Sequence, residues 1–172
     1  MSRVFLVLTA AGSGSRLGAD LPKALVTLAG DTLLGHALSR VATLADSRGQ
    51  AVNPGTPTDI AGVVISAPAD FLDAISRQIP PEFPVPAAVV PGGASRQASV
   101  GAAVEEVLRL YGPVTAADLV LVHDAARCFT PASVFLRLIE ALRAGASAVI
   151  PALPVTDTIK RVSELNPNAA FA

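Results

Sequence analysis

The chain has 172 residues, a length typical of one domain. Its 13 Lys and Arg against 14 Asp and Glu give a formal charge of -1, which excludes a general electrostatic attraction to nucleic acid or an acidic membrane. Hydrophobic residues make up 51%, which excludes a disordered chain, but no apolar run reaches the roughly 18 residues of a membrane span. The single Cys128 excludes an intramolecular disulfide and a cysteine-only metal site, and without an export signal we expect a cytoplasmic protein.

Apolar, β-branched stretches alternate along the chain with the patterns of amphipathic helices. Residues 4–9 form a continuous apolar run, which is typical of a central strand buried on both faces. Pro84 and Pro86 place a strand at 85–90 toward an edge of the sheet. The strands predicted to alternate with helices are 4–9, 62–67, 85–90, 118–123 and 146–152.

Helices are predicted between these strands. The first begins at Thr32, the second runs from about Pro68 to the Pro80-Pro81 pair, the third follows Gly92-Gly93 and the fourth covers 131–143. Each of the first three helices has an apolar face. In the first helix this face is formed by Leu33, Ala37, Val41 and Leu44, and in the second by Phe71, Ile75 and Ile79. In the third it is formed by Val100, Val104, Val107, Leu108 and Tyr111.

The alternation predicts an α/β fold, a three-layer sandwich around a mostly parallel, Rossmann-like sheet. Residues 46–61 contain Asn53-Pro54-Gly55 and Pro57, and we expect a mobile loop there. Residues 157–163 have the pattern of a strand with no partner to return to. We therefore expect an incomplete chain, with one domain over 1–154 and an unfinished segment over 155–172.

Four polar motifs follow predicted strands, at 12–23, 92–99, 123–127 and 157–160. In an open parallel sheet, ligands bind beyond the carboxyl ends of the strands. The topology therefore predicts that the four motifs meet at one rim and form one site.

The first motif combines small residues with two cations, Arg16 and Lys23. Its consecutive backbone N–H groups can cradle phosphate oxygens, while Arg16 offers a planar fork and Lys23 a compact charge. The spacing fits neither the dinucleotide fingerprint nor the P-loop. The alternative is a flexible connection with two solvated cations, but both lysines of the chain, Lys23 and Lys160, fall inside rim motifs.

The third motif puts Asp124 and Arg127 after a buried strand. Asp124 suits a ribose hydroxyl or a divalent ion carried by phosphates, or else a turn, and Arg127 suits a substrate phosphate. In the second motif, backbone amides and Ser99 suit a base edge, and the alternative is a helix cap with Ser95 as its N-cap. His123 is interpreted as a core histidine, and the sequence shows no metal-ligand cluster.

The motifs together resemble those of the 2-C-methyl-D-erythritol 4-phosphate cytidylyltransferase family over nearly the whole chain. They are Ala10-Ala11-Gly12-x-Gly14-x-Arg16 with Pro22-Lys23, Gly92-Gly93-x-x-Arg96-x-x-Ser99, His123-Asp124-Ala125-Ala126-Arg127 and Asp157-Thr158-Ile159-Lys160. The resemblance implies a nucleotide-diphospho-sugar transferase-like fold, transfer of CMP from CTP to methylerythritol phosphate, Mg²⁺ held mainly by the CTP phosphates, and a homodimer with a β-arm that starts near 155. It also implies a role in non-mevalonate isoprenoid biosynthesis.

The resemblance further implies roles for individual residues. Arg16 and Lys23 would be catalytic, and the acceptor substrate would meet Arg127, Asp124 and Thr158. The nucleotide would be held by Ala10, Ala11, Gly12, Gly93, Ser99, Asp124 and Ala125. The chain departs from the family where Ala24 replaces a usual Gln and Cys128 a usual Pro. The resemblance also implies a C-terminal quarter with an Arg and a Lys for the acceptor, and we expect neither to have a counterpart before Ala172. Transfer to another alditol phosphate, such as ribitol 5-phosphate, and a non-catalytic nucleotide-binding module stay open as alternatives.

Overall fold

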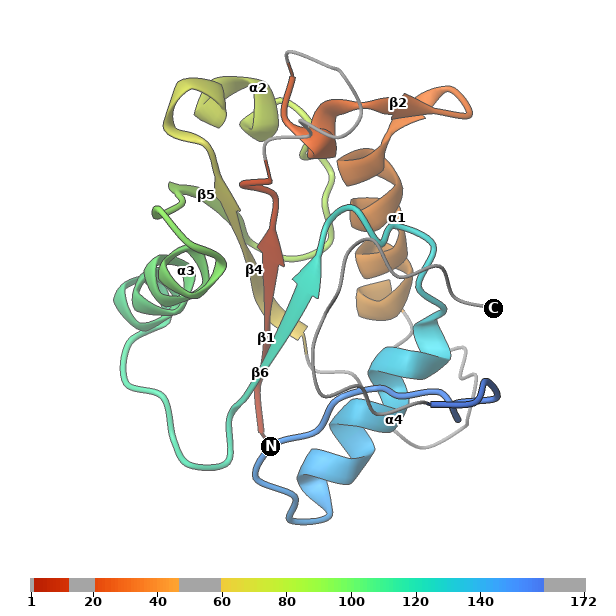
Figure 1. The fold of residues 1–172 in the computed structure, drawn as a ribbon. Coiled ribbons are helices and arrows are strands. Elements are labelled where there is room, and N and C mark those ends of the chain that lie inside the picture. The colour runs from red at the N-terminus through yellow and green to blue at the C-terminus, as the bar shows by residue number, and fades with distance from the viewer. Residues whose placement is uncertain (1, 13–20, 47–59, 160–172) are drawn as a thin grey trace.

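Strand β1 (Val4–Thr9) lies at the centre of a parallel sheet because its first five residues are apolar and fully buried. The structure is a computed structural model that describes residues 2–12, 21–46 and 60–159. Strands β4 (Ile60–Ala67) and β6 (Leu119–Asp124) pair with the two sides of β1, and β5 (Ala87–Pro91) pairs with the outer side of β4. The resulting order is β5-β4-β1-β6, as Figure 1 shows.

Alternate residues of β1 face two different helical layers. Leu6 and Leu8 pack in one cluster with buried residues of α1 (Leu33–Asp46) and α4 (Ala132–Arg143). Phe5 and Val7 pack in a second cluster with Ala103 and Val107 of α3 (Arg96–Tyr111). Figure 1 shows α3 on one side of the sheet and α1 and α4 on the other. The predicted three-layer α/β fold is therefore confirmed.

The order of the strands fixes where a ligand can bind. From β1 the chain moves outward through β4 to β5, and α3 then carries it across the opposite face to β6, on the other side of β1. The direction of winding therefore reverses between β1 and β6. A crevice opens at such a switch point, beyond the carboxyl ends of the two strands.

Shorter elements complete the described part of the chain. The 3-10 turn η2 (Lys23–Leu25) leads into a small antiparallel hairpin of β2 (Thr27–Leu28) and β3 (Asp31–Thr32). The helix predicted from Pro68 is a 3-10 turn, η3 (Ala69–Phe71), followed by the five-residue α2 (Leu72–Ser76). Of its predicted apolar face, Ile75 is fully buried, while Phe71 and Ile79 pack partly buried against the same cluster.

Several predicted boundaries differ from the observed ones. Asp46 still belongs to α1, and β4 begins at Ile60, so only 47–59 of the predicted loop lies outside the described residues. Strand β5 lies at the sheet edge that its flanking prolines predicted. Leu108, expected inside, is 45% exposed because the face of α3 that carries Ala103 and Val107 is the one that packs on the sheet.

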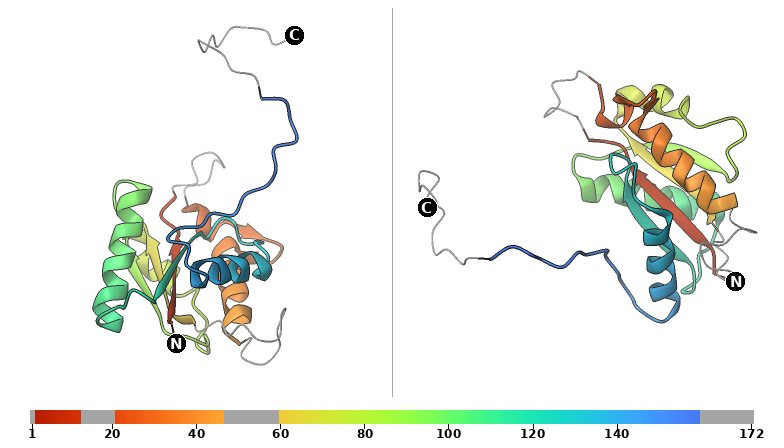
Figure 2. Two further views of the ribbon diagram at one scale, coloured as in Figure 1. Left: turned by 90° about the horizontal axis from the view of Figure 1, so that it is seen from below. Right: turned by 90° about the vertical axis from the view of Figure 1, so that its right-hand side faces the viewer.

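The segment after α4 does not form the strand predicted at 146–152. These residues have no regular secondary structure, and Ile150 is 84% exposed. Residues 157–159 are also not a strand, and 160–163 lie outside the described residues. Figure 2 shows this segment running away from the sheet and its helices. Among the described helices, none has the length and apolar character needed to span a bilayer.

Candidate functional site

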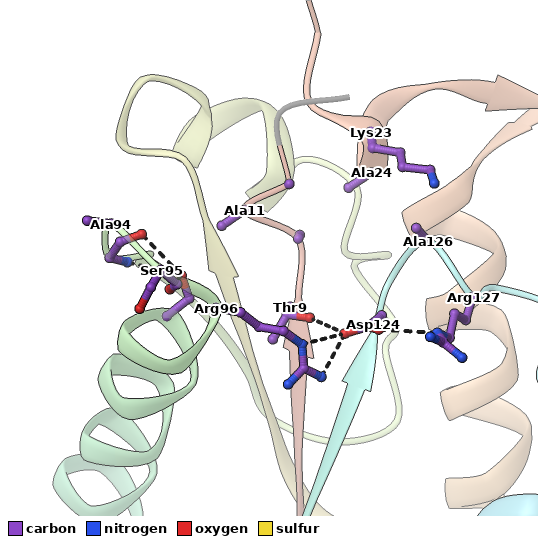
Figure 3. Close-up of a pocket in the computed structure, with 14 residues that line it drawn as sticks. Thr9, Ala11, Lys23, Ala24, Ala94, Ser95, Arg96, Asp124, Ala126 and Arg127 are labelled. Carbon is purple, nitrogen blue, oxygen red and sulfur yellow. Dashed lines mark hydrogen bonds and ion pairs between the residues drawn. The ribbon is translucent and has the colours of Figure 1, made fainter. Parts of the chain in front are cut away.

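A pocket of about 580 Å³ opens at the carboxyl ends of β1 and β6, beside the start of α3. Three of the four predicted motifs meet there, and Figure 3 shows their side chains around it. The lining residues are Thr9, Ala10, Ala11, Gly12, Lys23, Ala24, Gly93, Ala94, Ser95, Arg96, Ser99, Asp124, Ala126 and Arg127.

The remaining predicted site residues lie elsewhere. Thr158, in the fourth motif, is exposed on the segment that runs away from the sheet and does not line the pocket. Ala125 is fully buried, and its N–H donates to the carbonyl oxygen of Thr9 at 3.1 Å, so Ala126 reaches the pocket in its place. Arg16 and Lys160 lie outside the described residues.

The carboxylate of Asp124 is the polar centre of the pocket. The register of the sheet sets Asp124 directly beside Thr9, whose hydroxyl donates to Oδ1 at 2.9 Å. Arg96 donates to the same oxygen from Nη2 at 2.9 Å and from Nε at 3.2 Å. Arg127 donates from Nε to Oδ2 at 3.2 Å. Two guanidinium groups from opposite walls of the pocket therefore share one carboxylate, as Figure 3 shows.

This arrangement holds Asp124 in its charged form. Partial burial alone would raise the pKa of Asp124, but the hydrogen bonds from Arg96 and Thr9, with the positive charges of Arg96 and Arg127, lower it below its usual value. An ionised carboxylate is only an acceptor of hydrogen bonds. Asp124 can therefore accept hydrogen bonds from hydroxyl groups of a ligand at neutral pH.

Lys23 is held on the rim by its own backbone. Its N–H donates to the carbonyl oxygen of Gly12 at 3.1 Å, which fixes the start of η2 beside the end of β1. The side chain is exposed, and within the described ranges its ammonium group forms no ion pair. An exposed ammonium group on the rim of a pocket suits an anionic ligand.

The start of α3 forms the opposite wall. Ser95 caps the helix by accepting the N–H of Ala98 at 3.1 Å, which confirms its predicted N-cap role. The hydroxyl of Ser99 accepts the N–H of Gly93 at 3.1 Å and donates to the carbonyl oxygen of Ser95 at 2.9 Å. A Cβ at Gly93 would overlap the side chain of Ala98. Ser99 thus braces the loop, and the glycine lets that loop pack against the helix.

His123 does not line the pocket, as its interpretation as a core histidine expected. Its ring packs edge-on against Phe135 with centroids 4.9 Å apart, and burial lowers its pKa. In the described ranges, no group of three His, Cys, Asp or Glu side chains is placed to hold a metal ion.

Two polar residues of the pocket had no role assigned from the sequence. Thr9 is the one polar residue in the apolar run of β1 and directly precedes the small-residue loop, which marks it as facing a site. Arg96 lies inside the second motif, but its partner Asp124 is 28 residues away. Only the packing of α3 against the sheet brings the two together.

The direction of winding reverses between β1 and β6, and the pocket lies at this point. These two features are typical of Rossmann-like α/β proteins, which bind ligands at the carboxyl edge of the sheet. Comparison with known families is more specific. Residues 4–167 match the sequence model of the IspD family, 2-C-methyl-D-erythritol 4-phosphate cytidylyltransferase, and the chain belongs to this family.

Individual relatives agree with this assignment. A 2-C-methyl-D-erythritol 4-phosphate cytidylyltransferase of Saccharopolyspora erythraea is 47% identical over 95% of this chain and 65% of its own length. One of Rhodococcus jostii is 40% identical over 94% of this chain and 61% of its own. A crystal structure of 4-diphosphocytidyl-2C-methyl-D-erythritol synthase is 30% identical with a TM-score of 0.63, covering 94% of this chain and 63% of that one. The chain thus spans less than two thirds of the length of these relatives.

Proposed function

We propose that the chain transfers CMP from CTP to 2-C-methyl-D-erythritol 4-phosphate, which forms 4-diphosphocytidyl-2-C-methyl-D-erythritol and pyrophosphate. The observation that carries the proposal is the meeting of Lys23, Asp124 and Arg127 in one pocket, beside the small residues that end β1. Membership of the family supports the same reaction. This reaction would place the protein in non-mevalonate isoprenoid biosynthesis.

The transfer needs a site that binds two phosphorylated molecules and neutralises charge. An oxygen of the acceptor phosphate attacks the α-phosphorus of CTP and forms a new P–O bond, while the bond to the β-phosphate oxygen breaks and pyrophosphate leaves. Negative charge on the α-phosphoryl oxygens grows during this step, and preorganised cations stabilise it. Lys23 is our catalytic residue on the described rim. Arg16, on the same loop but outside the described residues, is the second.

The remaining pocket residues orient the two substrates. The backbone of Ala10, Ala11, Gly12 and Gly93 surrounds the nucleotide, with Ser99 bracing the Gly93 loop. The ionised Asp124 accepts hydrogen bonds from hydroxyl groups, and Arg127 binds the acceptor phosphate through its terminal nitrogens. Roles for Ala125 and Thr158 rest on the family resemblance alone.

The pocket residues fit a divalent ion such as Mg²⁺ only if the phosphates of the bound nucleotide hold it. Asp124 is the one carboxylate among the described lining residues, and its Oδ1 already accepts three hydrogen bonds from Arg96 and Thr9. The described pocket residues therefore do not form a set of protein ligands for the cation. Phosphate oxygens of the nucleotide and several waters would bind such a hard cation instead. When bound, the ion would neutralise part of the triphosphate charge.

The proposal is tested by measuring pyrophosphate release from CTP in the presence of Mg²⁺, with methylerythritol phosphate, with ribitol 5-phosphate and without acceptor. We expect release only with an acceptor, and fastest with methylerythritol phosphate. Faster release with ribitol 5-phosphate would instead identify another alditol phosphate as the substrate. CTP binding without release from either acceptor would favour a non-catalytic nucleotide-binding module.

Nucleotide preference is measured separately by thermal shift with CTP, ATP, GTP and UTP. Because the family implies CTP, and because the Gly93 loop braced by Ser99 suits a base edge, we expect CTP to stabilise the protein most. Equal shifts with all four nucleotides would refute a base-specific pocket. The homodimer implied by the resemblance stays a prediction, which sedimentation equilibrium would check.

A further inference from the structure

Arg96 and Arg127 engage Asp124 in unequal ways. Arg96, the first residue of α3, directs two nitrogens at Oδ1, which also accepts the Thr9 hydroxyl. Arg127, just beyond β6, directs only Nε at Oδ2, at 3.2 Å. Within the described residues, the two terminal nitrogens of Arg127 have no hydrogen-bond partner. The carboxylate is thus held mainly from the α3 side.

This unequal sharing of the Asp124 carboxylate differs from the pairing that would be expected of Asp124 and Arg127 alone. Arg127 lies three residues after Asp124, and an arginine paired with a carboxylate frequently forms a bidentate pair of two parallel hydrogen bonds, one to each oxygen. The donors on Oδ1 prevent this, since three hydrogen bonds from Arg96 and Thr9 already converge on that oxygen. Arg127 is left with one hydrogen bond to the carboxylate and an exposed guanidinium that lines the pocket.

Stability does not explain the Arg96 contact. The Arg96 side chain is 63% exposed and that of Asp124 is 30% exposed. An ion pair this accessible to water contributes little to folding. A role in arranging the pocket accounts better for a contact that crosses it from one wall to the other, as Figure 3 shows.

We infer that Arg96 is a positioning residue: by occupying Oδ1 of Asp124 it holds the carboxylate against Thr9 and keeps the Arg127 guanidinium available for the phosphate group of the acceptor. The inference rests on the proposed function only for the identity of that acceptor. Its structural core is competition between two arginines for one carboxylate. Without Arg96, Asp124 turns toward Arg127 and withdraws it from the ligand.

The first test uses the protein without substrates. Nitrogen-15 spectra of the Arg127 Nε–H group are recorded for the wild type, Arg96→Ala, Arg96→Lys and Arg109→Ala during titration with inorganic phosphate. Arg109 is the matched control because it is an exposed arginine of the same helix, paired with Glu106 outside the pocket. We expect Arg96→Ala to shift the Arg127 signal and to need about tenfold more phosphate for the same change, since a paired guanidinium binds anions less well.

The expected effect on phosphate binding differs from one variant to the next. Arg109→Ala should match the wild type, and Arg96→Lys should fall between, because a lysine supplies the charge without the planar fork. An Arg127 signal and a phosphate titration that are unchanged in Arg96→Ala would overturn the inference. So would a wild-type Arg127 signal that does not respond to phosphate.

The second test uses steady-state kinetics of the full chain. Arg96→Ala should raise KM for methylerythritol phosphate about tenfold, with kcat and KM for CTP changed less than about threefold. A merely structural role would lower the amount of active enzyme and leave both KM values alone. A rise in KM for CTP alone would assign Arg96 to the nucleotide and refute the inference. If the wild type transfers nothing, the proposed function fails, whereas the phosphate titration still decides the role of Arg96.

Discussion

Replacing Lys23 with alanine separates a catalytic charge from a structural one. The side chain is exposed, lines the pocket, and has no ion-pair partner within the described ranges. The contact that fixes Lys23 in the fold is made by its backbone N–H to Gly12, which alanine retains. The substitution therefore removes one charge and leaves the local backbone bonding in place.

The size of the effect follows from where the charge acts. A charge-assisted contact to the α-phosphoryl oxygens, in a pocket closed by substrate, is worth about 3 kcal/mol or more of transition-state stabilisation, on the order of a hundredfold in rate. An exposed, unpaired cation contributes little to folding. We expect Lys23→Ala to lower kcat about a hundredfold and to leave Tm nearly unchanged.

The assay measures kcat, KM for CTP and Tm on the same preparations of Lys23→Ala, Lys23→Arg and Arg77→Ala. Arg77 is an exposed cation after α2 that does not line the pocket, so its loss controls for a general change of charge. Lys23→Arg should retain part of the rate because it restores the charge with a different shape. If Lys23→Ala keeps more than about a tenth of the wild-type kcat, the catalytic assignment of Lys23 is wrong.

Further predictions concern stability. Hydrogen bonds from Arg3 and the N–H of Thr115 hold the pKa of Asp118 well below its usual range, so its contribution to stability is complete above about pH 4 and is lost as the pH falls below that. Melting curves between pH 2 and 6 should therefore show a lower Tm at pH 6 and a flatter pH dependence for Asp118→Asn than for the wild type; equal slopes would refute this. Gly93→Ala forces a Cβ onto Ala98 and should cost about 1–3 kcal/mol, whereas Gly101→Ala, in open space on α3, should stabilise by about 1 kcal/mol. Urea unfolding measures both, and a neutral Gly93→Ala would show that the loop relaxes freely.

The sequence predicted the centre of this fold because the relevant signals are local. The apolar run of β1 can be buried only as a strand with neighbours on both sides, and α1 repeats its apolar residues at helical spacing. The carboxyl ends of parallel strands lie at one edge, so three motifs far apart in the sequence meet in the pocket.

The segment at 146–152 shows where this reasoning fails. Its β-branched and apolar residues have the composition of a strand, and yet Ile150 is among the most exposed apolar side chains described. Strand preference measures how a side chain fits a half-buried pleated surface, so it has no effect until a partner strand lies alongside. Composition alone does not reveal whether such a partner strand exists. Residues 157–159 of the fourth motif lie on the same segment, and they do not line the pocket.

Arg96 could not be assigned from the sequence for a different physical reason. Its function depends on which oxygen of Asp124 it occupies, and that is decided by how α3 crosses the sheet to reach the switch point. The crossover that creates the crevice also brings the first residue of α3 over the end of β6. The two walls of the pocket therefore belong to opposite faces of the sheet, and a side chain that bridges them couples one face to the other. Asp124, at the junction, transmits a change on the α3 side to Arg127 on the other.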